Sequence, residues 1–214
     1  MEEELAWLIT NVSKYSVALP ALIGVFVFFR LENTQKVILL LVLISVLSEA
    51  SAHILGFTGA GQTVVYYLFT CFEFGLLTYV FAEGIKPFFR PIFFLAIALF
   101  FLIFILIDMI WISGIAQFNS YSTAIEGLIL IFFALIFFYK TLHELKIRFL
   151  EREPLFWISA GVLLYFSSSL FIFLFSNYVN SSTTALFIIW GIHGIFSILL
   201  NVFYSTALWV RPNL

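Results

Sequence analysis

Residues 92–112 read IFFLAIALFFLIFILIDMIWI, an apolar stretch with a single charged residue, Asp108. A helix needs about 20 predominantly apolar residues to cross a bilayer, and this stretch is long enough. Six further apolar runs follow the same pattern, separated by polar or Gly/Pro-containing breaks. The seven runs cover residues 12–29, 37–57, 63–83, 92–112, 121–142, 155–177 and 184–210. We therefore expect an all-α fold, a seven-transmembrane helix bundle.

The composition places the whole chain in a membrane. Of its 214 residues, 63% are hydrophobic and 10% are charged, whereas a soluble domain has about 45–50% apolar and about 25% charged residues. The breaks are too short to fold alone, so residues 1–214 are expected to form a single integral membrane domain. This excludes a soluble enzyme and makes the lipid bilayer the first partner.

The net charge and the number of cysteines argue against nucleic-acid-binding proteins and against proteins built on disulfides or cysteine-bound zinc. The net charge is −2 and no break carries a basic block, which argues against nucleic-acid binding. The one cysteine, Cys71, lies within an apolar run. Neither a disulfide framework nor a cysteine-based zinc site can be built from it.

Lysine and arginine are divided unequally between the breaks. Nine of the ten lie at the first, third and fifth breaks or after the last run, and Lys14 is the exception. The positive-inside rule puts this basic side in the cytoplasm. We expect the N-terminus outside and the C-terminus cytoplasmic, with the chain in a bacterial inner membrane.

Several ionisable side chains lie inside the apolar runs, where a charge is costly unless it faces the bundle interior. They are Glu49, His53, Glu73, Asp108, Glu126 and His193. In the expected orientation they gather in the outer half of the bundle, which indicates a pocket open to the outside. No Lys or Arg is expected deep in a run, so these acids need histidines, protons or a bound cation for neutralisation.

Helical spacing groups some of these residues on common faces. Along the last run, polar or aromatic residues recur at intervals of three or four, and on the second run Glu49 and His53 are four apart. The predicted ligand-binding residues are Glu49, His53, Glu73, Glu126, Trp190, His193, Ser197, Asn201 and Tyr204. The alternative is that these side chains have only a structural role. In that case the histidines would be hydrogen-bonded inside the core and Asp108 would lie at the membrane interface.

Six short segments stand out along the chain: Leu19-Pro20-Ala21-Leu22-Ile23-Gly24, Glu73-Phe74, Phe118-Asn119-Ser120-Tyr121 with Glu126, Pro154-Leu155-Phe156-Trp157-Ile158, Tyr165-Phe166-Ser167, and Ile192-His193 with Asn201. Together these segments resemble an uncharacterised family of small seven-span bacterial membrane proteins common in Bacteroidetes. That family has no assigned chemistry. Its members are often encoded beside sensor kinases, so the resemblance implies a signalling role and a cytoplasmic signalling partner.

The topology also resembles that of the zinc-dependent intramembrane hydrolases of the ceramidase and adiponectin-receptor type. Their last span carries HxxxH, but here it reads His193-Gly194-Ile195-Phe196-Ser197 and lacks the second histidine. A zinc site would need His53, His193 and a carboxylate such as Glu73. Microbial rhodopsins share the topology too, but the last run has no lysine, which excludes a retinal Schiff base.

These observations favour a receptor or sensor without a cofactor. Its ligand is expected to be small or lipidic and cationic, bound in an outward-facing, carboxylate-rich pocket. A metal-dependent intramembrane lipid hydrolase is the first alternative. A proton- or cation-coupled transporter that uses Glu73 is the second, although such transporters usually carry internal repeats.

Overall fold

The computed structural model describes residues 2–58, 61–86, 88–114, 119–144, 149–175 and 183–211, and within these ranges it leaves out the side chains of 2–3, 57–58, 171, 173–175 and 183–188. Every regular element in the described part is helical, which confirms the predicted all-α class. The elements are α1 (Glu2–Ser16), α2 (Ala18–Phe26), η1 (Phe28–Arg30), α3 (Asn33–Thr58), α4 (Gln62–Ile85), α5 (Pro91–Ile107), η2 (Asp108–Ile112), α6 (Ser120–Glu144), η3 (Leu150–Arg152), α7 (Pro154–Phe175) and α8 (Thr183–Trp209).

Six helical stretches in the described residues are long and apolar enough to cross a membrane. They are Glu4–Phe26, Asn33–Gly56, Gln62–Ile85, Pro91–Ile112, Ser120–Glu144 and Ile189–Trp209. The predicted sixth run corresponds to α7, which counts as a shorter apolar helix over Pro154–Leu170. The chain is thus an apolar helical bundle of the kind found in multi-pass membrane proteins.

The first stretch differs from the prediction in where it begins and in its continuity. The sequence pattern placed it at 12–29, but the helix begins at Glu2 and is interrupted at Val17, between α1 and α2. Pro20 explains the interruption, because it has no backbone N–H to donate to the carbonyl of Ser16. Because the apolar stretch now covers Glu4–Phe26 and not residues 12–29, Lys14 lies near its middle and not at its edge.

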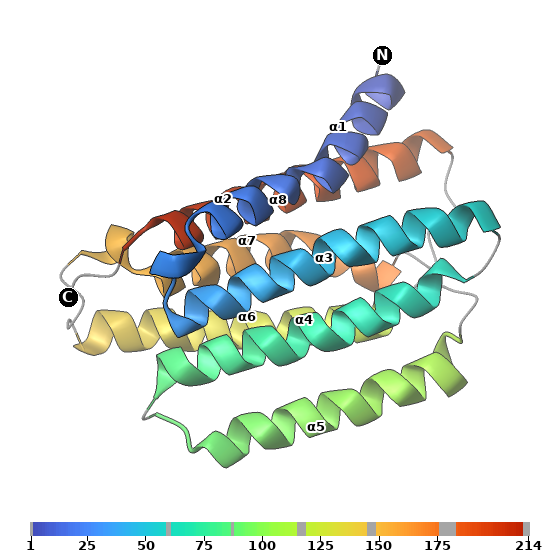
Figure 1. Cartoon of the computed structure of the whole chain (residues 1–214). Coiled ribbons are helices and arrows are strands. Elements are labelled where there is room, and N and C mark those ends of the chain that lie inside the picture. Colours follow the sequence, from blue (N-terminus) through green and yellow to red (C-terminus); the bar gives the residue numbers. More distant parts are fainter. Residues whose placement is uncertain are drawn as a thin grey trace.

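The helices run side by side, and α1 with α2 packs along α8, so that the first and last helices are neighbours while the two termini lie at opposite ends of the bundle (Figure 1). Next to α8 lie α7 and then α6, while α3 packs on α4 and α4 also contacts α6. Helix α5 lies at the edge of the bundle and packs mainly on α4. The first and last helices thereby face α3 and α4 across the bundle interior.

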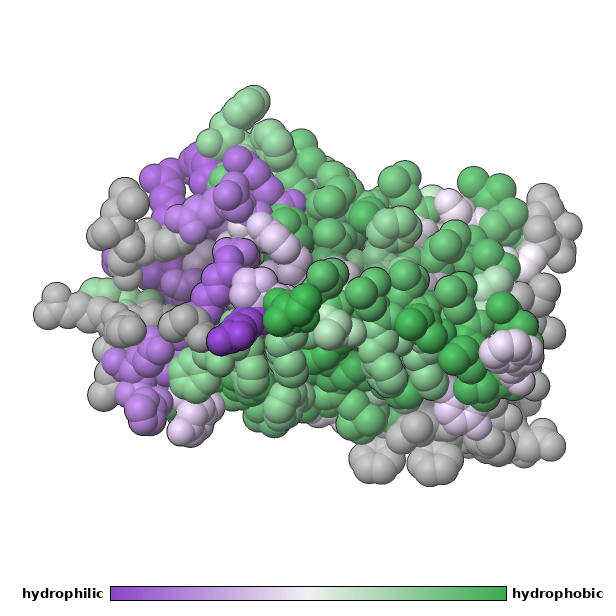
Figure 2. Space-filling model, turned by 90° about the horizontal axis from the view of Figure 1, so that it is seen from below, coloured by the Kyte–Doolittle hydropathy of each residue, from purple (hydrophilic) through white to green (hydrophobic). Residues whose placement is uncertain are grey.

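The core is rich in phenylalanine and lies among α4, α5, α6 and α7. Its largest fully buried side chains include Phe74, Phe81, Phe101, Phe133 and Phe166. Other large apolar side chains point outward, as a membrane protein requires. Figure 2 shows hydrophobic side chains over most of one face and hydrophilic ones gathered at one end.

Asp108 joins α5 to α6. It is fully buried and begins the π-helical turn η2. Its Oδ1 accepts a hydrogen bond from Ser113 Oγ at 2.7 Å, and its Oδ2 accepts from the backbone N–H of Ser122 at 3.1 Å and from the Ser122 hydroxyl. Ser122 lies in the first turn of α6, where a carboxylate satisfies a free N–H and complements the helix dipole. Asp108 is therefore buried in the protein, where its carboxylate links η2 to the first turn of α6; its expected depth at the membrane interface stays a prediction.

Candidate functional site: a polar cavity between α1, α8 and α3, α4

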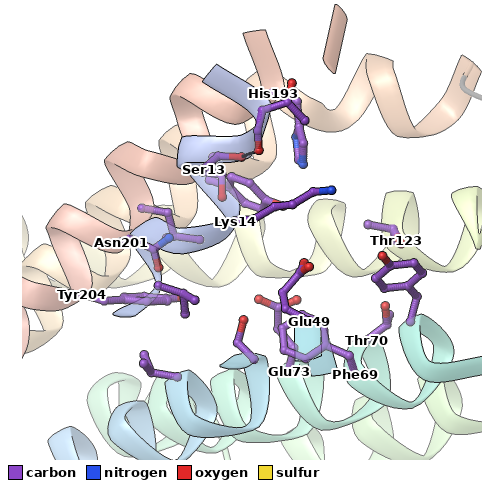
Figure 3. A pocket seen from close by; sticks show the side chains of 18 of the residues that line it. Ser13, Lys14, Glu49, Phe69, Thr70, Glu73, Thr123, His193, Asn201 and Tyr204 are labelled. Atoms are coloured by element: carbon purple, nitrogen blue, oxygen red, sulfur yellow. Dashed lines mark hydrogen bonds between the residues drawn. The ribbon is translucent and has the colours of Figure 1, made fainter. Parts of the chain in front are cut away.

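A cavity of about 400 Å³ opens between the first and last helices and the pair α3 and α4, with further wall residues from α6, α7 and the segment before α6 (Figure 3). Its lining is mostly polar or aromatic. The residues are Thr10, Ser13, Lys14, Val17, Val42, Ser45, Glu49, Tyr66, Phe69, Thr70, Glu73, Asn119, Thr123, Tyr165, Trp190, His193, Ser197, Leu200, Asn201 and Tyr204.

The structure brings most of the predicted residues to this one cavity. The whole stripe of α8 lines it, because Trp190, His193, Ser197, Asn201 and Tyr204 share the face that α8 turns to the interior. Glu49 from α3 and Glu73 from α4 lie across from this stripe (Figure 3). Residues from opposite ends of the sequence therefore enclose a single space.

Two of the predicted residues lie elsewhere. His53 is exposed on α3, one turn beyond Glu49, and does not line the cavity. Glu126 on α6 is fully buried and does not line it either. Both carboxylate oxygens of Glu126 lack a hydrogen-bond partner among the described residues. The predicted role of these two side chains in ligand binding stays a prediction.

Lys14 is the cavity residue that the sequence analysis missed. It lies near the middle of the Glu4–Phe26 stretch and reaches into the cavity from α1, opposite Glu49 and Glu73 (Figure 3). This corrects the expectation that no basic residue lies deep in a membrane stretch. The signal was present in the sequence, because Thr10, Ser13, Lys14 and Val17 recur at intervals of three, one and three and share one helix face.

The cavity lies between the middle of the bundle and the end away from the basic connectors. Lys14, Glu73 and Asn201 lie near the middle of their helices, whereas His193 is only four residues from the start of Ile189–Trp209. Glu49 lies in the second half of α3, toward that same end. This is the half in which the sequence predicted the pocket.

Hydrogen bonds between helices hold the walls. Asn201 Nδ2 donates to Ser16 Oγ at 2.7 Å, which ties α8 to α1. Asn119 Nδ2 donates to Thr70 Oγ1 at 2.9 Å, which ties the start of α6 to α4. Because both bonds fix polar side chains at the cavity wall, the site is organised before any ligand binds.

His193 is held by α7 and by neighbouring rings. Its Nδ1 lies 3.0 Å from Ser169 Oγ, within hydrogen-bond distance. The ring centroids of Tyr165 and Trp190 lie 5.4 and 5.6 Å from that of His193. The imidazole therefore lies beside two aromatic rings at the wall of the cavity.

The three residues proposed as zinc ligands do not come together. His193 and Glu73 line the cavity, but His53 is on the outer surface of α3. Within the part of the chain that the structure describes, no group of three His, Cys, Asp or Glu side chains is placed to hold one metal ion. The geometry gives no support to the hydrolase alternative.

No family model, curated protein or solved structure matches this chain. The resemblance to small seven-span bacterial membrane proteins thus stays a prediction from the sequence.

Proposed function

We propose that this chain is a seven-span, receptor- or sensor-like membrane protein that binds a small or lipidic ligand through a cationic group. This proposal rests on one observation: Glu49 and Glu73 line one cavity of about 400 Å³ together with hydroxyl and aromatic side chains. Carboxyl groups inside a membrane protein are costly and mark functional sites by default. A cavity of this size with a few converging polar groups is typical of small-molecule sites.

Lys14 narrows the chemistry of the ligand. Its ammonium lies opposite two carboxyl groups, so the cavity holds a basic group as well as two acidic ones. A purely cationic ligand would gain from Glu49 and Glu73 but would be repelled by Lys14. We therefore favour a ligand with a cationic group at one end and an anionic or hydrogen-bond-accepting group at the other.

We infer the orientation of the chain in the membrane from the positions of its basic residues. Arg30, Lys86, Arg90, Arg152 and Arg211 lie in or beside the connectors at the end of the bundle away from the cavity. The positive-inside rule puts that end in the cytoplasm, the N-terminus outside and the cavity toward the outside of the cell. In a bacterium this would be the inner membrane.

The helices that line the cavity offer a route for signalling. Helices α1 and α8 both contribute cavity residues, and α2 and α8 continue together toward the basic end. A ligand that binds one arrangement of these helices better than another shifts their equilibrium, and the cytoplasmic end changes with it. A cytoplasmic signalling partner would detect that change.

Thermal unfolding in detergent tests the proposal. The probes are choline, ethanolamine, glycine betaine and spermidine, titrated onto wild-type protein and onto Glu73→Gln. A compound that binds in the cavity raises the Tm of the wild type and has no effect on Glu73→Gln. Glu83→Gln is the matched control, because Glu83 lies on the same helix, pairs with Lys86 and is outside the cavity.

Two results would oppose the proposal. If every stabilising compound acted equally on wild type and Glu73→Gln, the carboxyl would have no part in binding. If purified protein carried stoichiometric zinc that His193→Ala abolished, the metal-dependent hydrolase would replace the receptor.

A further inference from the structure

Glu126 is a buried carboxyl group next to the polar cavity that ligand contacts do not explain. It lies on α6, is fully buried, and does not line the cavity. Neither of its carboxyl oxygens has a hydrogen-bond partner among the described residues. An unpaired carboxylate in an apolar interior is very unfavourable, so this group needs a proton or a cation to neutralise it.

Glu126 and Glu73 lie at nearly the same height on two packed helices. Helices α4 and α6 contact each other and run in the same direction (Figure 1). Phe81 of α4 and Phe133 of α6 meet between them, with ring centroids 6.0 Å apart. Glu126 is seven residues before Phe133, and Glu73 is eight residues before Phe81. Seven residues are about two helical turns, so Glu126 shares the face that Phe133 turns to α4, and the heights of the two glutamates differ by about 1.5 Å.

The two carboxyl groups have different surroundings. Glu73 lines the polar cavity, and the charge of this carboxyl acts on Glu126 behind it (Figure 3). Glu126 is enclosed by apolar side chains. Leu130, one turn further along α6, is fully buried, and Phe166 of α7 packs on Gly127, with its Cδ1 3.0 Å from the place of an added Cβ. One carboxyl of the pair is therefore open to the cavity and the other is sealed in the core.

The charges around this pair do not balance without a proton. Lys14 is the lysine or arginine among the cavity residues, and its charge acts on Glu49. The other titratable side chains that face Glu126 or the cavity are Tyr66, Cys71, Asp108, Tyr165, His193 and Tyr204. Of these only His193 can become positive, and it lies within hydrogen-bond distance of Ser169. Since two nearby carboxyl groups in a low dielectric do not both ionise, Glu73 and Glu126 together retain a proton.

Tyr204 connects the pair to the cavity. It lines the cavity, is 4% exposed, and its hydroxyl has no hydrogen-bond partner among the described residues. The charges of both Glu73 and Glu126 act on this side chain. A phenol O–H can donate to a carboxylate, so Tyr204 is suited to stabilise whichever of the two glutamates is ionised.

We propose that Glu73 and Glu126 form one proton-binding site at the wall of the polar cavity. The pair holds a proton while the cavity is empty, and a cationic group that binds beside Glu73 displaces this proton. The retained proton follows from the two carboxyl groups alone, whereas its displacement rests on the proposed function.

The displacement step conserves charge. The O–H bond of the protonated carboxyl breaks, its electron pair stays on the carboxylate, and the proton passes to water in the cavity. The cationic group of the ligand then supplies the positive charge that the proton provided. Because one proton leaves for each cation that binds, the apparent affinity for a cation rises with pH, by at most about tenfold per pH unit.

Infrared spectroscopy of the full chain at pH 7 tests the retained proton. The protein is purified in a maltoside detergent, which has no carbonyl group, and the readout is the D2O-sensitive carbonyl band of protonated carboxyl groups. Glu126→Gln should lose the intensity of one carboxyl, because the remaining Glu73 faces the cavity opposite Lys14 and ionises. Glu73→Gln should keep the band, since Glu126 stays sealed in the core. An unchanged band in Glu126→Gln would overturn the proposal.

Two further variants complete this experiment. Glu83→Gln is the matched control and should keep the band, because Glu83 is an acid on α4 that pairs with Lys86 outside the cavity. Glu126→Met replaces Glu126→Gln if the latter does not fold, since an apolar side chain suits the surroundings of this position. It should lose the band as well, and a full band in Glu126→Met would equally refute the site.

Choline tests the displacement, because its quaternary ammonium keeps its charge at every pH. Its apparent affinity is measured from the rise in Tm at about pH 6 and at about pH 8. Wild type and Glu83→Gln should bind choline more tightly at the higher pH, whereas Glu126→Gln should bind it equally at both. Equal affinity of the wild type at both pH values would refute the displacement. Failure of choline and the other cationic probes to bind would refute the proposed function, and the infrared band would still decide the proton site.

Discussion

Asn201 on α8 donates a hydrogen bond to the hydroxyl of Ser16 on α1, across 185 residues of sequence and a distance of 2.7 Å. Ser16 Oγ in turn donates to the carbonyl of Ser13 at 2.6 Å. The bond lies at the wall of the polar cavity, beside the point where α1 ends. It fastens the first helix to the last, the two helices that face Glu49 and Glu73.

Replacing Asn201 with Ala should lower the free energy of unfolding by about 1 kcal/mol, the scale of hydrogen bonds between membrane helices. Chemical denaturation in detergent measures this change. In a double-mutant cycle with Ser16→Ala, the two losses should be strongly non-additive. Additive losses would show that the two side chains do not stabilise each other.

Asp108→Ala should be more damaging, because it removes the acceptor for Ser113 and for two donors of Ser122. We expect a loss of about 3 kcal/mol, since hydrogen bonds to charged groups are the strong ones. Ser113→Ala removes only one of these bonds and should cost about 1 kcal/mol. Equal stability of Asp108→Ala and wild type in denaturation would contradict the structural role of this carboxyl.

Glu126→Met should leave the free energy of unfolding unchanged or raise it by about 1 kcal/mol. The carboxyl is fully buried and has no hydrogen-bond partner among the described residues, so an apolar side chain of similar length removes a desolvation cost. Glu126→Gln is the control, because it keeps the buried polar group. A marked loss of stability in Glu126→Met alone would reveal a partner for this carboxyl, such as a bound cation.

The orientation can be tested by cysteine labelling in a Cys71→Ser background. Gly61→Cys probes the connector before α4, where an added Cβ meets nothing within 4 Å. Arg90→Cys probes the exposed connector before α5, at the other end of α4. An impermeant maleimide should label Gly61→Cys in intact cells and Arg90→Cys only after permeabilisation. The reverse pattern would invert the chain and place the polar cavity toward the cytoplasm.

Glu153, before α7, should make stability depend on pH. Burial raises the pKa of its carboxyl above the ordinary value, and the negative charge of Glu32 adds to this, while the backbone N–H of Leu155 opposes it. A raised pKa in the folded state means that stability falls as pH rises through the unfolded and then the folded pKa. Glu153→Gln should therefore raise the Tm at pH 7 and have no such effect at pH 3.5. The same gain at both pH values would exclude titration of this group.

Much of the polar cavity could be predicted, because its residues lie on regular helices. The spacing of His193, Ser197, Asn201 and Tyr204 was enough to place them on one face, and that face does turn inward. His53 shows the limit of this reasoning. It is four residues from Glu49 and was expected to share its environment, yet its side chain is exposed in the second half of α3.

The sequence by itself determined the class of protein, since apolar runs and scarce charges leave little but a membrane bundle, and the uneven distribution of Lys and Arg marked one end of it. Only the tertiary structure decided which faces meet. It brought Lys14 opposite Glu49 and Glu73 and left Glu126 buried outside the cavity. Helical periodicity tells which residues share a face, but the partner of that face depends on how distant helices pack. One such contact is made by the buried Gln35 in the first turn of α3, which donates hydrogen bonds to the carbonyls of Ala207 and Val210 at the end of α8.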